Sequence, residues 1–192
     1  QTFKYQLPIF RFTESGVCKM ESKRVKEEYA IILDFMPHGY PFDKRPVHRK
    51  TPIAQAVGLE HFTLLELVPK KDIFLQPYQK IYIGEGKRDQ IHHISGKIAM
   101  DKLTATAKSE LNFVIRDIVD KNKDRFVDFF NNARPLSTRM HQLELLPGVG
   151  KKHMWQIVEE RRNEPFKDFE DIKIRVKLLP DPKKTIIRRI VS

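Results

Sequence analysis

The stretch Leu145–Lys152 reads LLPGVGKK and decides how the last part of the chain folds. Upstream of it, Met140, Leu143 and Leu146 share one side of a helical repeat and predict a helix from about Ser137 to Leu146. The residues that indicate a second helix downstream are Met154, Trp155, Ile157, Val158 and Arg161. A proline and two glycines between two helices predict a tight hairpin.

This hairpin is predicted to bind an anion. Glycine accepts a positive φ and places no side chain between its backbone and an approaching ligand. We therefore expect the amides of Gly148, Val149 and Gly150 to point outward, at the positive end of the dipole of the next helix. Lys151 and Lys152 add full charges beside them. Such a site suits one phosphate of a nucleic-acid strand, and it reads no base.

Residues 145–152 resemble the helix-hairpin-helix signature of proteins that repair, replicate and process DNA and RNA. The downstream stretch PFKDFEDI, residues 165–172, is similar to the link between tandem copies of that motif. Within it, Asp168 and Asp171 have the spacing of a capping box, with Asp in place of the usual Glu. The resemblance therefore implies a second copy of the motif after this link.

The second copy is expected to be degenerate. Its hairpin falls at Leu179–Pro182 and its last helix at Lys183–Val191, and both glycines are missing. Asp181 places a negative charge where a phosphate would lie. We expect this copy to pack against the rest of the fold and not to bind an anion.

From Glu28 onward the pattern is typical of β-strands. Five short runs are rich in β-forming residues, and no helical crossover separates them. These runs are Tyr29–Phe35, Ile53–Val57, Phe62–Val68, Lys80–Ile83 and Ile91–Ile98. Short strands without crossover helices predict a small antiparallel barrel of the OB or a similar kind.

Residues 104–132 change to a helical period. One apolar stripe predicts a helix that Thr104 caps, and aromatic residues from Phe126 to Phe130 predict a second helix that belongs to the core. The stripe consists of Leu111, Val114, Ile115, Ile118 and Val119.

The predicted fold is α+β with two domains. We expect an OB-like barrel at 28–103, a helical connector at 104–135 and an all-α tandem helix-hairpin-helix domain at 136–192. From about Glu28 the whole chain resembles an uncharacterised archaeal protein family that joins an OB-like β domain to a C-terminal helix-hairpin-helix pair. That resemblance implies a nucleic-acid-binding role and no particular reaction.

The charge of the chain points to a polyanionic partner. Lys and Arg number 36 against 25 Asp and Glu, so the formal net charge is +11. Residues 136–192 hold 13 basic and 8 acidic side chains, an excess of +5. Nucleic acid is the partner that we expect, although a basic surface also occurs for solubility alone.

A second basic segment lies between the first two predicted strands. Residues His38–Pro52 alternate aromatic residues with the cations Arg45, Arg49 and Lys50. OB-type barrels often use this loop to bind single strands, with aromatics stacking on bases. The alternative is a solvated loop that its three prolines hold over the end of the barrel.

An enzymatic alternative follows from the hairpin. In bifunctional DNA glycosylases that share this hairpin, the lysine two positions beyond the second glycine forms a Schiff base, and an aspartate farther along assists. By this resemblance, Lys152 takes the position of the nucleophile and Asp171 or Glu170 that of the assisting carboxylate. Those enzymes surround the hairpin with a many-helix domain and a base-accepting cleft, for which this chain has too few helical residues. We therefore expect a protein that binds RNA or DNA without catalysis.

A protein–protein assembly module is the third possibility for the function of this chain.

The remaining features set limits. No apolar run is long enough to cross a membrane, and the single cysteine, Cys18, favours a reducing cytoplasm. No spacing of His and Cys predicts a metal site, and nothing predicts a cofactor. Residues 1–27 form an N-terminal tail that opens with Gln1, and Met20 is a candidate initiator, in which case residues 1–19 would not be native.

Overall fold

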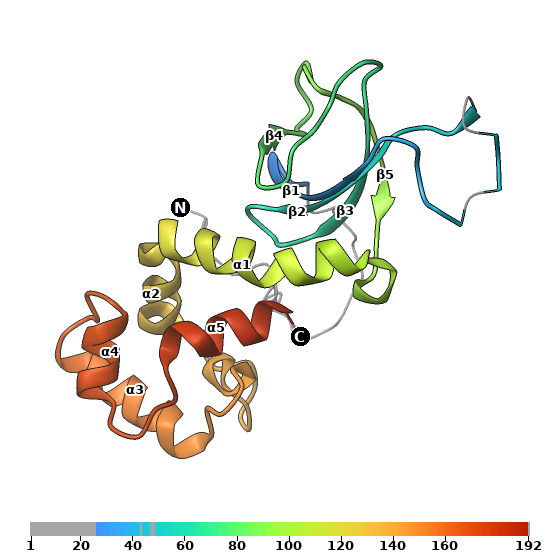
Figure 1. Cartoon of the computed structure of the whole chain (residues 1–192). Coiled ribbons are helices and arrows are strands. Elements are labelled where there is room, and N and C mark those ends of the chain that lie inside the picture. Colours follow the sequence, from blue (N-terminus) through green and yellow to red (C-terminus); the bar gives the residue numbers. More distant parts are fainter. Residues whose placement is uncertain (1–25, 43, 47–48, 192) are drawn as a thin grey trace. The chain divides into compact units, whose positions relative to one another are not determined.

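The computed structural model describes residues 26–42, 44–46 and 49–191 (Figure 1). The predictions for the N-terminal tail, including Cys18 and Met20, lie outside the described residues. Contacts along the chain define two compact units, with the boundary between Val114 and Ile115. The first holds the strands and the second holds most of the helices. The domain limits at 28–103, 104–135 and 136–192 remain predictions.

The strand unit contains one five-stranded sheet. Its strands are β1 (Tyr29–Met36), β2 (Ile53–Gly58), β3 (Leu64–Pro69), β4 (Lys80–Tyr82) and β5 (Ile91–Lys97). They lie in the order β4-β1-β2-β3-β5, and every neighbouring pair is antiparallel. The five predicted strands and the α+β class are confirmed. The sheet curls into a half-barrel with β4 and β5 at its edges, so the closed barrel that we expected is not confirmed.

One face of this sheet forms the core of the unit. Alternate residues of each strand point to the same face because the side-chain period of a strand is two. The buried cluster consists of Ala30, Ile32, Ala54, Ala56, Leu65, Leu67, Leu75, Ile81, Ile83 and Ile91. In β1 and β2 the residues between these members are buried as well, so both faces of these two strands are buried.

A buried amide joins the sheet to the start of helix α1 (Ala105–Lys121). Gln55 is fully buried on β2, and its Nε2 donates to the carbonyl of Lys102 at 3.2 Å. Its Oε1 accepts from the N–H of Thr104 at 2.9 Å. The hydroxyl of Thr104 in turn accepts from the N–H of Ala107 at 3.1 Å, so the predicted cap is confirmed.

The helical unit contains the last part of α1 and four further α-helices among the described residues. They are α2 (Lys123–Asn132), α3 (Lys151–Asn163), α4 (Phe169–Arg175) and α5 (Pro182–Val191), and a short 3-10 helix, η4 (Gln142–Leu145), precedes α3. A second 3-10 helix, η3 (Met100–Lys102), belongs to the strand unit. The aromatic residues of α2 are buried as predicted.

The helix that we expected from Ser137 to Leu146 is wrong. Residues 135–141 form a turn instead, in which Pro135 and His141 make an isolated antiparallel bridge. The N–H groups of Leu136 and Ser137 both donate to the carbonyl of Met140. Only Gln142–Leu145 are helical, and they form a single 3-10 turn.

Two side chains explain this difference. Gln142 is buried; its Oε1 accepts from the N–H of Arg134 at 2.8 Å, which holds the turn closed. His141 starts η4 with a capping box, because its Nδ1 accepts from the N–H of Leu143 while Glu144 accepts from the N–H of His141. A cap at His141 prevents a helix from starting earlier.

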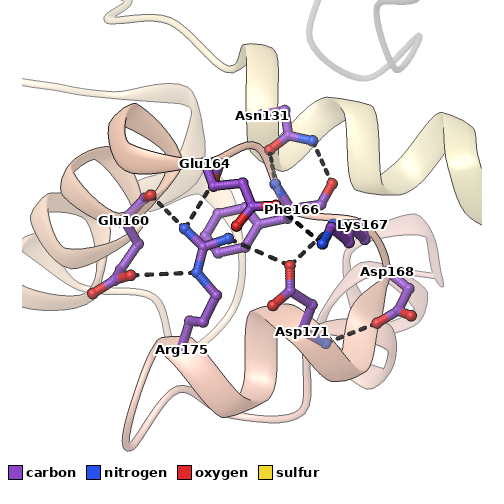
Figure 2. Close-up of polar contacts among 8 residues, drawn as sticks. All are labelled: Asn131, Glu160, Glu164, Phe166, Lys167, Asp168, Asp171 and Arg175. Carbon is purple, nitrogen blue, oxygen red and sulfur yellow. Dashed lines mark hydrogen bonds and ion pairs between the residues drawn. The ribbon is translucent and has the colours of Figure 1, made fainter.

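The link between α3 and α4 is held by Arg175, as Figure 2 shows. Its guanidinium lies 3.4 Å from a carboxylate oxygen of Glu160 and 3.3 Å from one of Asp171, and it donates to the carbonyl of Glu164 at 2.8 Å. It also stacks over the ring of Phe166, with 4.6 Å to the centroid. Four partners on one side chain fix the direction in which the chain leaves α3.

The N-termini of α4 and α5 are both capped by carboxylates. Asp168 accepts from the N–H of Asp171 at 2.8 Å, so the predicted cap of α4 is confirmed. In a capping box, the side chain of Asp171 would accept from the N–H of the N-cap residue Asp168. Here it accepts instead from the N–H of Lys167, the residue before the cap. Asp181 caps α5 by accepting from the N–H of Lys184 at 3.0 Å.

Candidate nucleic-acid interface

The hairpin before α3 turns at a single glycine in the left-handed region. Gly148 has φ +81°, whereas Gly150 has φ −88° and ψ 178°, an extended conformation that any residue adopts. Positive φ is therefore needed at Gly148 alone. Val149 lies between them with its side chain buried, which anchors the hairpin to the core.

Several backbone N–H groups at this hairpin have no acceptor within the described part of the chain. The first turn of α3 begins with the bond from Met154 to the carbonyl of Gly150, so the amides of residues 151–153 precede any intrahelical acceptor. The amides of Gly148 and Gly150 are also without a described partner. The N–H of Val149 already donates to Leu146, so our expectation that it faces a phosphate is corrected.

The two glycines differ in the space around them. A Cβ on Gly148 would lie 3.0 Å from Cγ of Pro180, whereas a Cβ on Gly150 would meet nothing within 4 Å. Pro180 belongs to the segment in which we expected a degenerate second copy of the motif, and it packs against this hairpin. The backbone at Gly150 instead faces open space.

The start of α3 is electropositive. Lys151 and Lys152 are exposed, and neither forms an ion pair with any residue that the structure describes. The first turn of α3 holds no acidic residue, and its N-cap, Gly150, supplies no side chain. At α4 and α5 the corresponding position is taken by Asp168 and Asp181. Free amides and two ammonium groups thus combine at α3 to favour an anion.

The basic loop between β1 and β2 belongs to the other unit. Arg45 and Arg49 are exposed and Lys50 is half-buried, while His48 lies outside the described residues. The ring of Phe42 remains 78% exposed. The structure therefore places these cations on the surface, in a different unit from the hairpin.

One aromatic residue of this loop is structural. Tyr40 stacks on Phe42 with 4.9 Å between centroids, and its hydroxyl donates to Glu66. Burial, followed by this hydrogen bond, raises the pKa of Tyr40 above its ordinary value. The hydroxyl therefore stays protonated and ties the loop to β3.

The residues of the enzymatic alternative are not brought together. Lys152 is exposed and no contact joins it to Asp171 or Glu170 within the described residues. Asp171 is bound to Arg175, and Glu170 lies 3.7 Å from Lys173. No group of three or more His, Cys, Asp or Glu residues in the described part of the chain is placed to hold a metal ion.

Sequence reasoning missed His141 beside the hairpin. Its side chain is buried, and this burial, with the nearby charge of Arg161, lowers its pKa below the ordinary value. The neutral ring can then accept at Nδ1 from Leu143, which the cap of η4 requires. The signal was present, since Glu144 follows three residues later at capping-box spacing.

The sequence pattern also placed Arg161 in the helix after the hairpin but assigned no role to its side chain. It donates to the carbonyls of Phe130 and Ala133, each at 2.8 Å, and so satisfies the end of α2 from α3. Its pKa is lowered by burial and by the neighbouring Arg162. This arginine is therefore a structural cation at the edge of the candidate interface.

Comparisons with known proteins give the family. Residues 26–192 match the model of a family described as protein of unknown function, DUF655. The chain belongs to the DUF655 family. It is 44% identical to an uncharacterized protein of Methanocaldococcus jannaschii, MJ0038, over 164 residues, which are 85% of this chain and 72% of that protein. The expected relationship to an uncharacterised archaeal family is thereby confirmed.

A crystal structure supports the fold of this DUF655 chain. Af1531 from Archaeoglobus fulgidus is 50% identical and superposes with a TM-score of 0.77, over 86% of this chain and 92% of that one. In the described residues of this DUF655 chain, no helix combines the length and apolar character that crossing a membrane requires.

Proposed function

We propose that this DUF655 protein binds RNA or DNA through the phosphate backbone and without catalysis. In this proposal, the segment from His141 to Asn163 acts as a helix-hairpin-helix motif whose first helix is the short η4. The half-barrel acts as an OB-like domain. The observation that carries the proposal is the free set of amides at Gly148, Gly150 and the start of α3, next to two exposed lysines.

The physical mechanism is electrostatic. One phosphate accepts from the amides, and Lys151 and Lys152 neutralise it and its neighbour. Binding releases counterions from the nucleic acid, so affinity falls steeply as salt rises and depends little on base sequence. The basic loop around Arg45, Arg49 and Lys50 supplies a second contact in the proposal. The single cysteine of the sequence agrees with action in a reducing cytoplasm.

The first prediction concerns the two lysines. Replacement of Lys151 and Lys152 by Ala removes two phosphate contacts, so the slope of log K against log salt decreases by about 1.4 to 1.8. Fluorescence anisotropy with single- and double-stranded RNA and DNA at several salt concentrations measures this slope.

A matched double variant separates the hairpin from general charge. Lys173 and Lys177 are exposed on or just after α4, and their replacement by Ala removes the same charge from the same unit. We expect this control to retain most of the slope. Equal losses in the two variants would show diffuse attraction and contradict the hairpin as the site.

A further inference from the structure

A groove of about 450 Å³ lies between the 135–141 turn and helix α3. Met154 and Val158 are buried among its lining residues. Trp155 and Met140 also line it, yet they remain 63% and 49% exposed. Trp155 and Met140 thus leave apolar surface open inside a concave site, and apolar surface that polar residues surround is typical of a ligand-binding groove.

The groove is strongly cationic. Its lining includes Arg139, Lys151, Arg161 and Arg162 against one carboxylate, that of Glu144. Arg161 is occupied by carbonyls of the α2 end, and Glu144 accepts from the backbone of His141. Arg139, Lys151 and Arg162 have no ion-pair partner among the residues that the structure describes. Three cations that lack an ion-pair partner within the described ranges therefore line the same groove as the exposed indole.

The groove is continuous with the hairpin. Lys151, Trp155, Val158 and Arg162 recur at i, i+4, i+7 and i+11 along α3, so they form one stripe of that helix. Trp155 follows Lys151 by one turn, about 6 Å along the axis. A phosphate at the hairpin would thus lie about one turn from the indole, with Arg162 at the far end of the stripe.

We propose that this groove binds an unpaired nucleobase stacked on Trp155, which makes the protein selective for single-stranded nucleic acid. The inference rests on the proposed function, because a phosphate held at the hairpin brings the next base to the indole. Stacking on an exposed aromatic ring tolerates any base, and cations beside the ring follow the backbone. A base in a duplex is stacked on both faces and is not available, so a duplex contacts only the hairpin.

The chain itself carries the reporter for the test. Trp155 is the single tryptophan of the sequence, so tryptophan fluorescence, excited at a wavelength that the five tyrosines do not absorb, reports on this groove. The full chain is titrated with oligothymidylate, with the same strand paired to oligoadenylate, and with a strand of equal length made of abasic sites. We expect oligothymidylate to quench the fluorescence, whereas the duplex and the abasic strand bind with little quenching.

Variants of Trp155 measure the contribution to affinity. Trp155→Leu keeps an apolar side chain but cannot stack, and we expect its affinity for oligothymidylate to fall by about 5-fold to 150-fold. Its affinity for the abasic strand should stay as in the wild type. Trp155→Phe restores part of the loss because it keeps an aromatic face. Phe113→Leu, which removes an aromatic residue that is 57% exposed on α1, is the control and should change neither affinity.

The outcomes separate this inference from the proposed function. Loss of affinity in the Lys151/Lys152 double variant together with unaltered binding by Trp155→Leu would overturn the base site and keep the phosphate site. Equal quenching by duplex and single strand would also overturn it. Failure of every strand to bind would contradict both proposals, and binding of a protein partner at Trp155 in the absence of nucleic acid would then indicate an assembly surface.

Discussion

At the scale of single residues, the two glycines of the hairpin have different physical roles. Gly148 is required by the fold, since it has a positive φ and Pro180 occupies the space of a side chain. Gly150 is not required by the fold, because its backbone is extended and its surroundings are open. A glycine that the free protein does not need suggests a position where a ligand approaches the backbone.

This difference gives a prediction. Gly150→Ala should change the free energy of unfolding by no more than about 1 kcal/mol, the usual cost of alanine at an N-cap. It should weaken nucleic-acid binding at least several-fold, because the new methyl group meets the phosphate. Urea denaturation and anisotropy on the same preparations measure the two effects.

Gly148→Ala is the paired variant. Alanine in the left-handed region costs about 1–2 kcal/mol, and contact with Pro180 adds to this. We expect the main effect of Gly148→Ala to be a loss of stability and the main effect of Gly150→Ala to be a loss of nucleic-acid binding. Wild-type affinity in a folded Gly150→Ala protein would show that no ligand approaches this backbone.

At the scale of elements, the path of the chain after α3 depends on one arginine. Arg175 is the member of α4 that reaches back to Glu160 and to the carbonyl of Glu164, as Figure 2 shows. The link itself is fixed to α2, where Asn131 accepts from the N–H of Phe166 at 2.8 Å and donates to its carbonyl at 2.9 Å. The position of α4 therefore rests on polar contacts as well as on its apolar face.

We predict that Arg175→Met lowers the free energy of unfolding by about 1–3 kcal/mol, since it leaves carbonyls and carboxylates without their donor. Arg175→Lys should recover only part of this, because one ammonium cannot reproduce the planar fork of a guanidinium. Urea denaturation measures both. Lys173→Ala on the same helix, which breaks only an exposed pair with Glu170, should cost well under 1 kcal/mol. A stability of Arg175→Lys equal to that of the wild type would contradict this role.

At the scale of the whole molecule, the excess of positive charge is divided between two units. The hairpin belongs to one and the loop with Arg49 and Lys50 to the other, and the chain as a whole carries +11. If both bind nucleic acid as proposed, the two contacts reinforce each other on a strand long enough to reach both, because the second then binds intramolecularly.

A length series tests this. Replacement of Arg49 and Lys50 by Ala should weaken binding to long strands and reduce their salt slope by about 1 to 2, while short strands that fill only the hairpin bind as before. Anisotropy with strands of increasing length measures it. Lys71→Ala with Lys87→Ala removes equal charge elsewhere in the same unit and should have a smaller effect. Equal weakening on short and long strands would contradict a second contact.

Much of the fold was predictable because the responsible interactions are local. Runs rich in β-forming residues identified all five strands, and a proline with two glycines identified the hairpin before α3. The caps at Thr104 and Asp168 follow from side chains that bind N–H groups three residues away. The helix expected over 137–146 failed because the bonds of Gln142 to Arg134 outweigh a helical spacing that the sequence also allows.

Local pattern therefore identified the five strands, the helices from α1 to α5 and the glycine-rich turn before α3, but not the turn over residues 135–141. Only the three-dimensional packing decided that Gln55 would be buried and satisfied by Thr104, that Pro180 would close one side of the hairpin, and that Trp155 would remain exposed in a cationic groove. The physical reason is that hydrogen bonds along a helix or within a turn join near neighbours in the chain, whereas burial and grooves depend on segments that the sequence keeps far apart.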